Sequence, residues 1–421
     1  MIRKVISLFV LFIACIVPLF INPFVRDIYN RPRALLMYVS CLLMAVLYLL
    51  KLKKTKLDNT IEDYILLIYL SIVIISTLFS VNIYQSLAGG EFREEGLAAL
   101  LCYFFIYFIV SRYYIFEEKH IKYLLTSALI VSIYAIVQYF GIDPLKVKSH
   151  LTGAVSTMGN RNFLGSYLTL IMPISMFLFI RSRKIIYFIL SGIFFMALLC
   201  SYTRGAWIAF LACMILFVYL VYKHKLSYRR YLGLIVLFFI IGIAFNITDN
   251  NQTLVRARSI GKDIAKTFDS SSSSESLGSG RIYIWKNALR LIPDRPILGS
   301  GPDTFGIVFM RKFDGLKSKT YDNNGKPFEV EVYIDKAHNE YLQIAVTNGV
   351  PAAIIYISFI VLIIVKTNKY MDHNALVIPV SAAVISYCVQ AFFNISVVSV
   401  APLFWVFIGL SENFIRKEYK H

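Results

Sequence analysis

The sequence predicts an all-α protein, a polytopic bundle of transmembrane helices with one large extracytoplasmic loop. It has 421 residues, of which 58% are hydrophobic and only 16% are charged, and its mean hydropathy is +0.65. A soluble domain of this length could not bury so much apolar surface. Apolar runs of about 18 residues, long enough for a helix to cross ~30 Å of hydrocarbon, recur along the chain. There are about twelve such runs, near 5–22, 33–50, 63–81, 97–112, 121–140, 162–180, 184–202, 204–222, 229–246, 347–365, 374–392 and 397–415.

The net charge of +18 follows the loops of this bundle and argues against a nucleic-acid partner. About half of the Lys and Arg residues fall in alternate loops and at the two ends of the chain, as in KLKKTK at 51–56. Cytoplasmic loops of membrane proteins carry this excess. We therefore expect a multi-pass protein of the cell membrane with both termini in the cytoplasm. The six cysteines lie inside apolar runs, which supports neither a disulfide framework nor a zinc site.

Hydropathy divides the chain into three parts. Residues 1–246 are expected to form an N-terminal bundle of about nine spans, and 338–421 a C-terminal bundle of about three. Residues 247–337 form an extracytoplasmic loop with short amphipathic helices. After a Ser-rich linker at 269–280, the loop predicts a helix that stops at Pro293. Its apolar face would hold Ile282, Trp285, Leu289 and Ile292.

A His-Asn pair marks the most informative stretch, YIDKAHNEYLQIAVTNGVPAA at 333–353. His338 and Asn339 stand where the long polar loop gives way to an apolar run. A neutral imidazole, whose unperturbed pKa is about 6.5, can take a proton from a hydroxyl that arrives from the aqueous side. The alternative interpretation is a polar helix start in which His338 only satisfies a cap.

Two arginines occupy positions where a cation suggests a ligand. Arg204, in SYTRGAW, stands at the outer mouth of a tight hairpin with Thr203 as a candidate N-cap. Its planar guanidinium can hold a phosphate through two hydrogen bonds. Arg281 opens the predicted loop helix, whose free N–H groups already favour an anion. The alternatives are that Arg204 snorkels beside Trp207 and that Arg281 touches lipid headgroups.

Two polar turns precede apolar runs at the outer side. Asn160 and Arg161, in GNRNFLGSYL, are equally compatible with turn chemistry and with ligand contact. Gly165 or Ser166 in the same stretch would let another helix come close. In the second turn, EFREE, Arg93 has glutamates on both sides, which predicts a solvated, self-neutralised helix start.

The acidic residues around His338 raise the question of a metal site. Carboxylates suit Mg²⁺ or Mn²⁺. However, EVEVYI alternates like a strand, and nothing in the sequence turns its acidic face toward His338. We therefore expect no metal at this set, which comprises Glu329, Glu331, Asp335 and Glu340.

Four blocks in this order resemble the O-antigen ligase family: GNRNFLGSYL, SYTRGAW, GRIYIW with PDRPILGSGPDTF, and KAHNEYLQIAVTNGVPA. The resemblance covers roughly residues 90 to 415. These enzymes are polytopic glycosyltransferases that move a glycan from undecaprenyl pyrophosphate to an acceptor at the outer face of the cytoplasmic membrane. In a related pattern, His and Asn are followed after nine residues by two glycines three apart. Here Gly349 matches the first glycine but Ala352 replaces the second, which disfavours the protein-glycosylating subgroup.

The resemblance implies a metal-independent, inverting transfer without a cofactor. His338 would be the base, and Arg204 and Arg281 would hold the diphosphate of the donor. The partners would be an undecaprenyl-pyrophosphate-linked glycan, membrane lipids and a glycan, lipid or protein acceptor. Alternatives are an O-antigen or exopolysaccharide polymerase, a protein O-oligosaccharyltransferase and, from another class, a transporter or flippase of the lipid-linked glycan. Further possible substrate contacts are Asn160, Arg161, Trp285 and Asn339.

Overall fold

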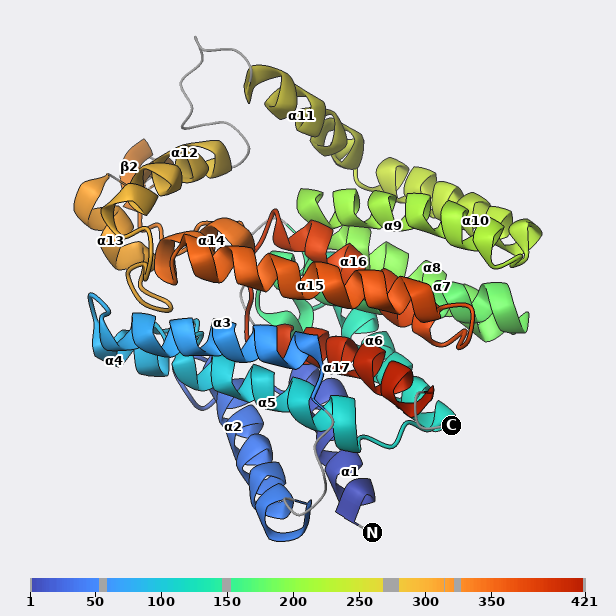
Figure 1. The fold of residues 1–421 in the computed structure, drawn as a ribbon. Coiled ribbons are helices and arrows are strands. Elements are labelled where there is room, and N and C mark those ends of the chain that lie inside the picture. The colour runs from blue at the N-terminus through green and yellow to red at the C-terminus, as the bar shows by residue number, and fades with distance from the viewer. Residues whose placement is uncertain are drawn as a thin grey trace.

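A computed structural model of the protein is overwhelmingly helical (Figure 1). It describes residues 2–52, 59–145, 153–267, 280–313, 315–321 and 327–418, without the side chains of 51–52, 260–267, 316–321, 327–332 and 418. The predicted helical fold class is confirmed. One antiparallel hairpin is added to it, in which Leu316 pairs with Val332.

A helix occupies each apolar run that was predicted to span the membrane. Their bounds are α1 (Ile2–Cys15), α2 (Asn30–Leu47), α3 (Ile61–Leu78), α5 (Leu97–Tyr113), α6 (Glu118–Tyr139), α7 (Arg161–Ser182), α8 (Ile185–Cys200), α9 (Arg204–Lys223), α10 (Tyr228–Thr248), α15 (Val350–Tyr370), α16 (Val377–Ala391) and α17 (Ala401–Glu418). Within the described part of the chain, 8 helices are both long and apolar enough to cross a membrane. Helices α5, α8 and α16 are apolar but shorter. The protein is therefore a multi-span membrane protein, and the count of twelve stays a prediction.

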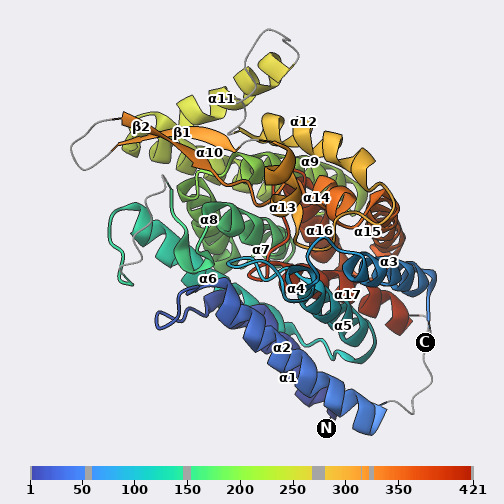
Figure 2. The same cartoon turned by 90° about the vertical axis from the view of Figure 1, so that its left-hand side faces the viewer.

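Shorter elements connect these helices. They are α4 (Ile83–Ala88), α11 (Gln252–Thr267), α12 (Arg281–Leu291), α13 (Phe305–Lys312), β1 (Leu316–Tyr321), β2 (Pro327–Val332) and α14 (Glu340–Thr347). Strand β2 lies where the alternating sequence predicts a strand. Helices α4, α12, α13 and α14 and the β-hairpin gather at one end of the bundle, which we call the loop end (Figure 1; Figure 2 faces it). Both chain termini lie toward the opposite end.

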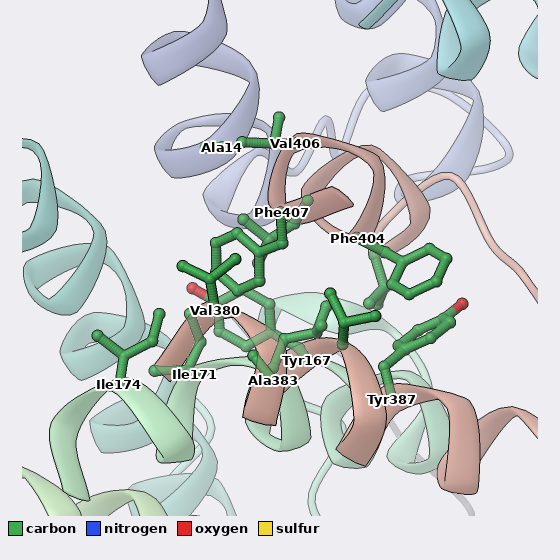
Figure 3. Close-up of a cluster of buried hydrophobic side chains, with 14 of the residues drawn as sticks. Ala14, Tyr167, Ile171, Ile174, Val380, Ala383, Tyr387, Phe404, Val406 and Phe407 are labelled. Carbon is green, nitrogen blue, oxygen red and sulfur yellow. The ribbon is translucent and has the colours of Figure 1, made fainter. Parts of the chain in front are cut away.

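Helix α7 lies at the centre of the bundle and is buried over nearly all of its length. Apolar side chains of α7, α16 and α17 interdigitate beside it, among them Tyr167, Tyr387 and Phe404 (Figure 3). A Cβ at Gly165 would lie 2.7 Å from the Cβ of Ala206 on α9, so glycine is needed for this approach. The predicted close approach of a helix at this stretch is confirmed.

Helix α12 forms where the sequence predicts it and ends beside Pro293, but its buried face differs from the prediction. Ile284, Ala288 and Leu291 are buried against α13 and α14, whereas Leu289 is 58% exposed. The reason is that α12 packs against other elements on two of its sides. Its core-facing side meets α13 and α14, and Trp285 instead packs on Phe392 at the end of α16, with ring centroids 5.4 Å apart.

Candidate active site

His338 is fixed in the loop that leads into α14. Asn339, not His338, caps this helix, because its Oδ1 accepts a hydrogen bond from the Leu342 N–H at 3.0 Å. Ala337 is held on both sides, since its N–H donates to Gln343 Oε1 at 2.8 Å and its carbonyl accepts from Trp285 Nε1 at 2.9 Å. His338 itself has a φ of 51°, a left-handed conformation that costs energy for a residue with a side chain. The capping interpretation of His338 is therefore unnecessary, and the strain points to a function of its side chain.

The imidazole of His338 is neutral in this environment. Its pKa is lowered to about 4. Burial is the main cause, and the positive charge of Arg281 lowers the pKa by more than the negative charge of Asp335 raises it. Its Nδ1 is buried and has no hydrogen-bond partner among the described residues. A neutral ring nitrogen of this kind is able to accept a proton.

Four arginines from four helices gather near one another, and one of them, Arg281, acts on His338; we call the four the arginine cluster. They are Arg161 at the start of α7, Arg204 at the start of α9, Arg256 in α11 and Arg281 at the start of α12. Burial lowers the pKa of Arg281 to about 10, and the charges of the other three act in the same direction. The pKa of Arg256 falls to about 10 from burial and from the charges of Arg161 and Arg204. Because these charges act on one another, the four side chains lie close together.

Local contacts hold the arginine cluster in place. Thr203 stands at the predicted N-cap position of α9, but its Oγ1 donates to the Arg161 carbonyl at 2.9 Å and so ties α9 to α7. Arg204 Nη1 donates to Ser259 of α11 at 2.8 Å. The Arg256 guanidinium lies over the ring of Tyr202, 5.4 Å from its centroid. Arg256 Nε is buried without a hydrogen-bond partner among the described residues, which leaves it able to donate to a ligand.

A second set of charges, from Asp335, Arg93 and Lys336, also acts on His338. Arg93 Nε donates to Asp335 Oδ2 at 2.5 Å, so the predicted self-neutralised helix start around Arg93 is wrong. The prediction failed because the partner of Arg93 lies far along the chain, where the local sequence does not reveal it. Glu95 is buried, which raises the pKa of its carboxyl to about 7, and it accepts a hydrogen bond from Tyr103 at 2.5 Å. Lys336 pairs with Asp303, which also accepts from the Gly90 N–H.

Residues 189–357 match the model of the O-antigen ligase family. The predicted resemblance is confirmed over this range, which runs from within α8 to within α15. A comparison with curated proteins gave no match. The O-antigen ligase match supports a membrane enzyme of the glycan ligase or polymerase type that uses a lipid-linked glycan and an acceptor.

The O-antigen ligase segment contains most of the residues just described. His338, Arg204, Arg256 and Arg281 fall inside it, as do Trp285 and Asn339, whereas Arg161 and its neighbour Asn160 precede it. The charges of Arg161 and Arg204 lower the pKa of Arg281, and the charge of Arg281 lowers the pKa of His338, so the structure brings these arginines together and Arg281 near His338. Asn160 caps α7 by accepting from the Asn162 N–H at 2.8 Å, and it faces a neighbouring cavity.

Sequence reasoning missed Arg256. It lies in α11, directly after a span, in the short sequence VRARS, where two arginines alternate without any chemical motif. A basic helix that follows a span without a linker was the available signal. That signal alone does not separate a ligand site from a helix lying on lipid headgroups.

The carboxylates considered for a metal have other partners where they are described. Asp335 is bonded to Arg93, and Glu340 accepts from Tyr356 at 2.5 Å and from Tyr387 at 3.3 Å. The side chains of Glu329 and Glu331 lie outside the described part of the structure. Among the side chains that it does describe, no group of three or more His, Cys, Asp or Glu is placed to hold a metal ion.

Proposed function

We propose that the protein is a glycosyltransferase that moves a glycan from undecaprenyl pyrophosphate to an acceptor hydroxyl at the outer face of the cytoplasmic membrane. The observation that carries the proposal is the arginine cluster, of which Arg281 acts on a half-buried, neutral His338. The O-antigen ligase match over residues 189–357 supports the same type of reaction.

The arginine cluster suits a diphosphate. Its guanidinium groups repel one another in the absence of an anion, and a bound diphosphate removes that repulsion. Each guanidinium presents a planar fork of donors that matches two phosphate oxygens. In the reaction the same groups stabilise the negative charge that develops on the leaving diphosphate, a term that is commonly the largest in catalysis. These four cations supply the charge that a divalent metal supplies elsewhere, so we propose a metal-independent transfer.

His338 would act on the acceptor. It accepts the proton of the acceptor hydroxyl while the hydroxyl oxygen bonds to the anomeric carbon of the glycan. The bond from that carbon to the diphosphate oxygen breaks, and undecaprenyl diphosphate leaves with the electron pair. Attack from the face opposite the leaving group inverts the configuration at the anomeric carbon. Because Arg281 lowers the pKa of His338, a bound diphosphate offsets this effect and makes His338 a stronger base only when the donor is in place.

The membrane orientation follows from charge and arrangement. Lys and Arg are concentrated at both termini and in alternate loops, and the termini lie away from the loop end (Figure 1). We propose cytoplasmic termini and an extracytoplasmic loop end. The lipid tail of the donor would then enter sideways between spans while its diphosphate reaches the arginine cluster at the rim of the bundle.

Replacing His338 separates a transferase from a carrier of lipid-linked glycans, because a flippase needs arginines to hold diphosphate but has no use for a base. We expect His338→Ala to lower the rate of glycan transfer about 10²–10⁴-fold and to leave binding of undecaprenyl diphosphate unchanged. The assay follows transfer from a purified lipid-linked glycan by the full-length protein in detergent. His373→Ala is the matched control, because His373 is exposed and follows α15, away from the loop end.

Two outcomes would contradict the proposal. Normal glycan transfer by His338→Ala would show that His338 is not the base. Movement of the lipid-linked glycan across proteoliposomes, without any transfer by the wild type, would identify a flippase.

A further inference from the structure

An open cavity of about 570 Å³ is lined in part by Asp335, in the segment that leads to His338. This volume is typical of small-molecule sites, which span roughly 300–1,000 Å³. The chain before α2, the turn at 91–93, the start of α7 and the segment before His338 form its walls. None of the four residues of the arginine cluster lines this cavity, although Asn160, which precedes Arg161 in the chain, does. The proposed diphosphate site therefore leaves the cavity free for a second substrate.

The walls combine aromatic rings with hydrogen-bond acceptors. The rings belong to Tyr29, Phe92, Phe163 and Tyr333. The acceptors include the carboxylates of Asp27, Glu91 and Asp335 and the side chain of Asn30. Asn30 Oδ1 and the Tyr29 hydroxyl are buried and have no hydrogen-bond partner among the described residues. The aromatic rings and the carboxylate acceptors of the walls together fit a ligand with hydroxyl groups.

The charge of the walls selects against anions. Among the described lining residues Arg93 is the one cation, and it is already bonded to Asp335. Glu91 pairs with Arg26 at 3.0 Å, where both side chains are exposed, and Asp27 accepts from backbone N–H groups at the start of α2. A phosphorylated or uronic-acid ligand would meet carboxylates here, whereas a neutral sugar donates its hydroxyls to them.

The cavity meets the proposed reaction centre at two points. Asp335 lines it and lies three residues before His338, whose pKa responds to both Asp335 and Arg93. Asn160 lines it and is followed directly by Arg161 of the arginine cluster. Asp335 and Asn160 therefore connect the aromatic, acidic cavity to His338 and to the arginine cluster.

We infer that this cavity binds the acceptor and that the acceptor is a neutral saccharide, which presents one hydroxyl to His338. The inference rests on the proposed function for the role of that hydroxyl. Aromatic rings cover the C–H faces of sugars, and carboxylate and amide oxygens accept from their hydroxyls. The carboxylates of the cavity disfavour the anionic diphosphate of the donor there.

Two exposed aromatic residues test the inference without disturbing the core. Tyr333 is 58% exposed and Phe92 is 41% exposed. The probe is full-length, fluorescently labelled protein in detergent on an array of neutral oligosaccharides, uronic-acid and phosphorylated oligosaccharides, and peptides. We expect the wild type to bind neutral oligosaccharides, and Tyr333→Ala and Phe92→Ala each to bind them about tenfold more weakly, the loss expected for an aromatic contact of about 1.4 kcal/mol. Tyr84→Ala is the matched control, since Tyr84 is 86% exposed on α4 at the same end but does not line the cavity.

Binding of undecaprenyl diphosphate by the same variants should match that of the wild type, because neither residue belongs to the arginine cluster. The inference is overturned if no neutral oligosaccharide binds, if anionic saccharides or peptides bind best, or if Tyr333→Ala and Phe92→Ala bind like Tyr84→Ala. The array and the transfer assay fail independently. Transfer with no binding of neutral saccharides refutes the acceptor site alone, and binding without any transfer refutes the proposed function.

Discussion

Two clusters of charge at opposite ends of the bundle differ in composition, since one contains both signs of charge and the other contains cations. At the end near the termini, carboxylates and cations alternate. Asp63 accepts from Arg112 and from Arg416, each at 2.6 Å, and Lys366 bonds both Glu62 at 3.1 Å and Glu412 at 2.9 Å. At the loop end, the arginine cluster gathers cations whose charges lower the pKa of Arg281 and Arg256.

The difference separates two uses of buried charge. A network with equal numbers of both signs satisfies itself, and it joins α3, α5, α15 and α17 in one place. Like charges held together cost free energy until a ligand of opposite charge arrives, which is the usual mark of a binding site. The comparison predicts that substitutions at the first cluster change stability and that substitutions at the second change ligand binding.

The largest effect is expected at Glu412. Its carboxylate is fully buried and accepts from Lys366 and from Arg416 Nε at 2.8 Å. Glu412→Gln removes one of the two carboxylate partners of Lys366 and of Arg416, so we expect the free energy of unfolding to fall by about 3 kcal/mol, the lower end of the cost of breaking a buried pair. Thermal unfolding in detergent measures this as a lower Tm, with undecaprenyl diphosphate binding by the folded protein unchanged.

An exposed ion pair provides the control for that experiment. Asp294 and Lys312 are 2.7 Å apart, with side chains 53% and 43% exposed. Asp294→Asn should cost less than about 1 kcal/mol. Equal losses of unfolding free energy in Glu412→Gln and Asp294→Asn would show that the buried network stabilises the fold no more than an exposed ion pair does.

A smaller effect is expected from Glu340, which directly follows the His-Asn pair. Burial raises the pKa of its carboxyl to about 7, more than the hydrogen bonds from Tyr356 and Tyr387 lower it. Between about pH 4.5 and 7 the folded protein keeps a proton that the unfolded chain has lost, so stability falls as the pH rises. The contribution is about 2–3 kcal/mol. Tm values measured from pH 5 to pH 8 should fall less steeply for Glu340→Gln than for the wild type, and identical slopes would contradict the assignment.

Sequence patterns predicted the helices well because each one is an apolar run of the required length. They also led to the proposal of His338, Arg204 and Arg281 as site residues, because each stands in or next to a polar loop at the outer side of the bundle. The role of Arg93 could not be predicted, since its partner Asp335 is 242 residues away. No local pattern encodes such a contact.

The buried face of α12 shows the same limit on a smaller scale. Apolar spacing marked Trp285 and Leu289 as one face, but α12 packs on α13 and α14 through Ile284 and Ala288. Which apolar residues become buried depends on the neighbouring elements. Arg256 was missed for the same reason, because only the placement of α11 beside α9 brings it to Arg204 and Arg161.

The central claim is that the arginine cluster binds the diphosphate of the donor, and Arg281 tests it most directly. The measurement is the affinity of the full-length protein in detergent for undecaprenyl diphosphate, compared among the wild type, Arg281→Ala and Arg290→Ala. Arg290 lies on the same helix but is exposed. Loss of a charge-assisted hydrogen bond worth about 1.5–3 kcal/mol should weaken binding about 10–100-fold in Arg281→Ala and leave Arg290→Ala unchanged. Wild-type affinity in Arg281→Ala, or an equal loss in both variants, would contradict the account.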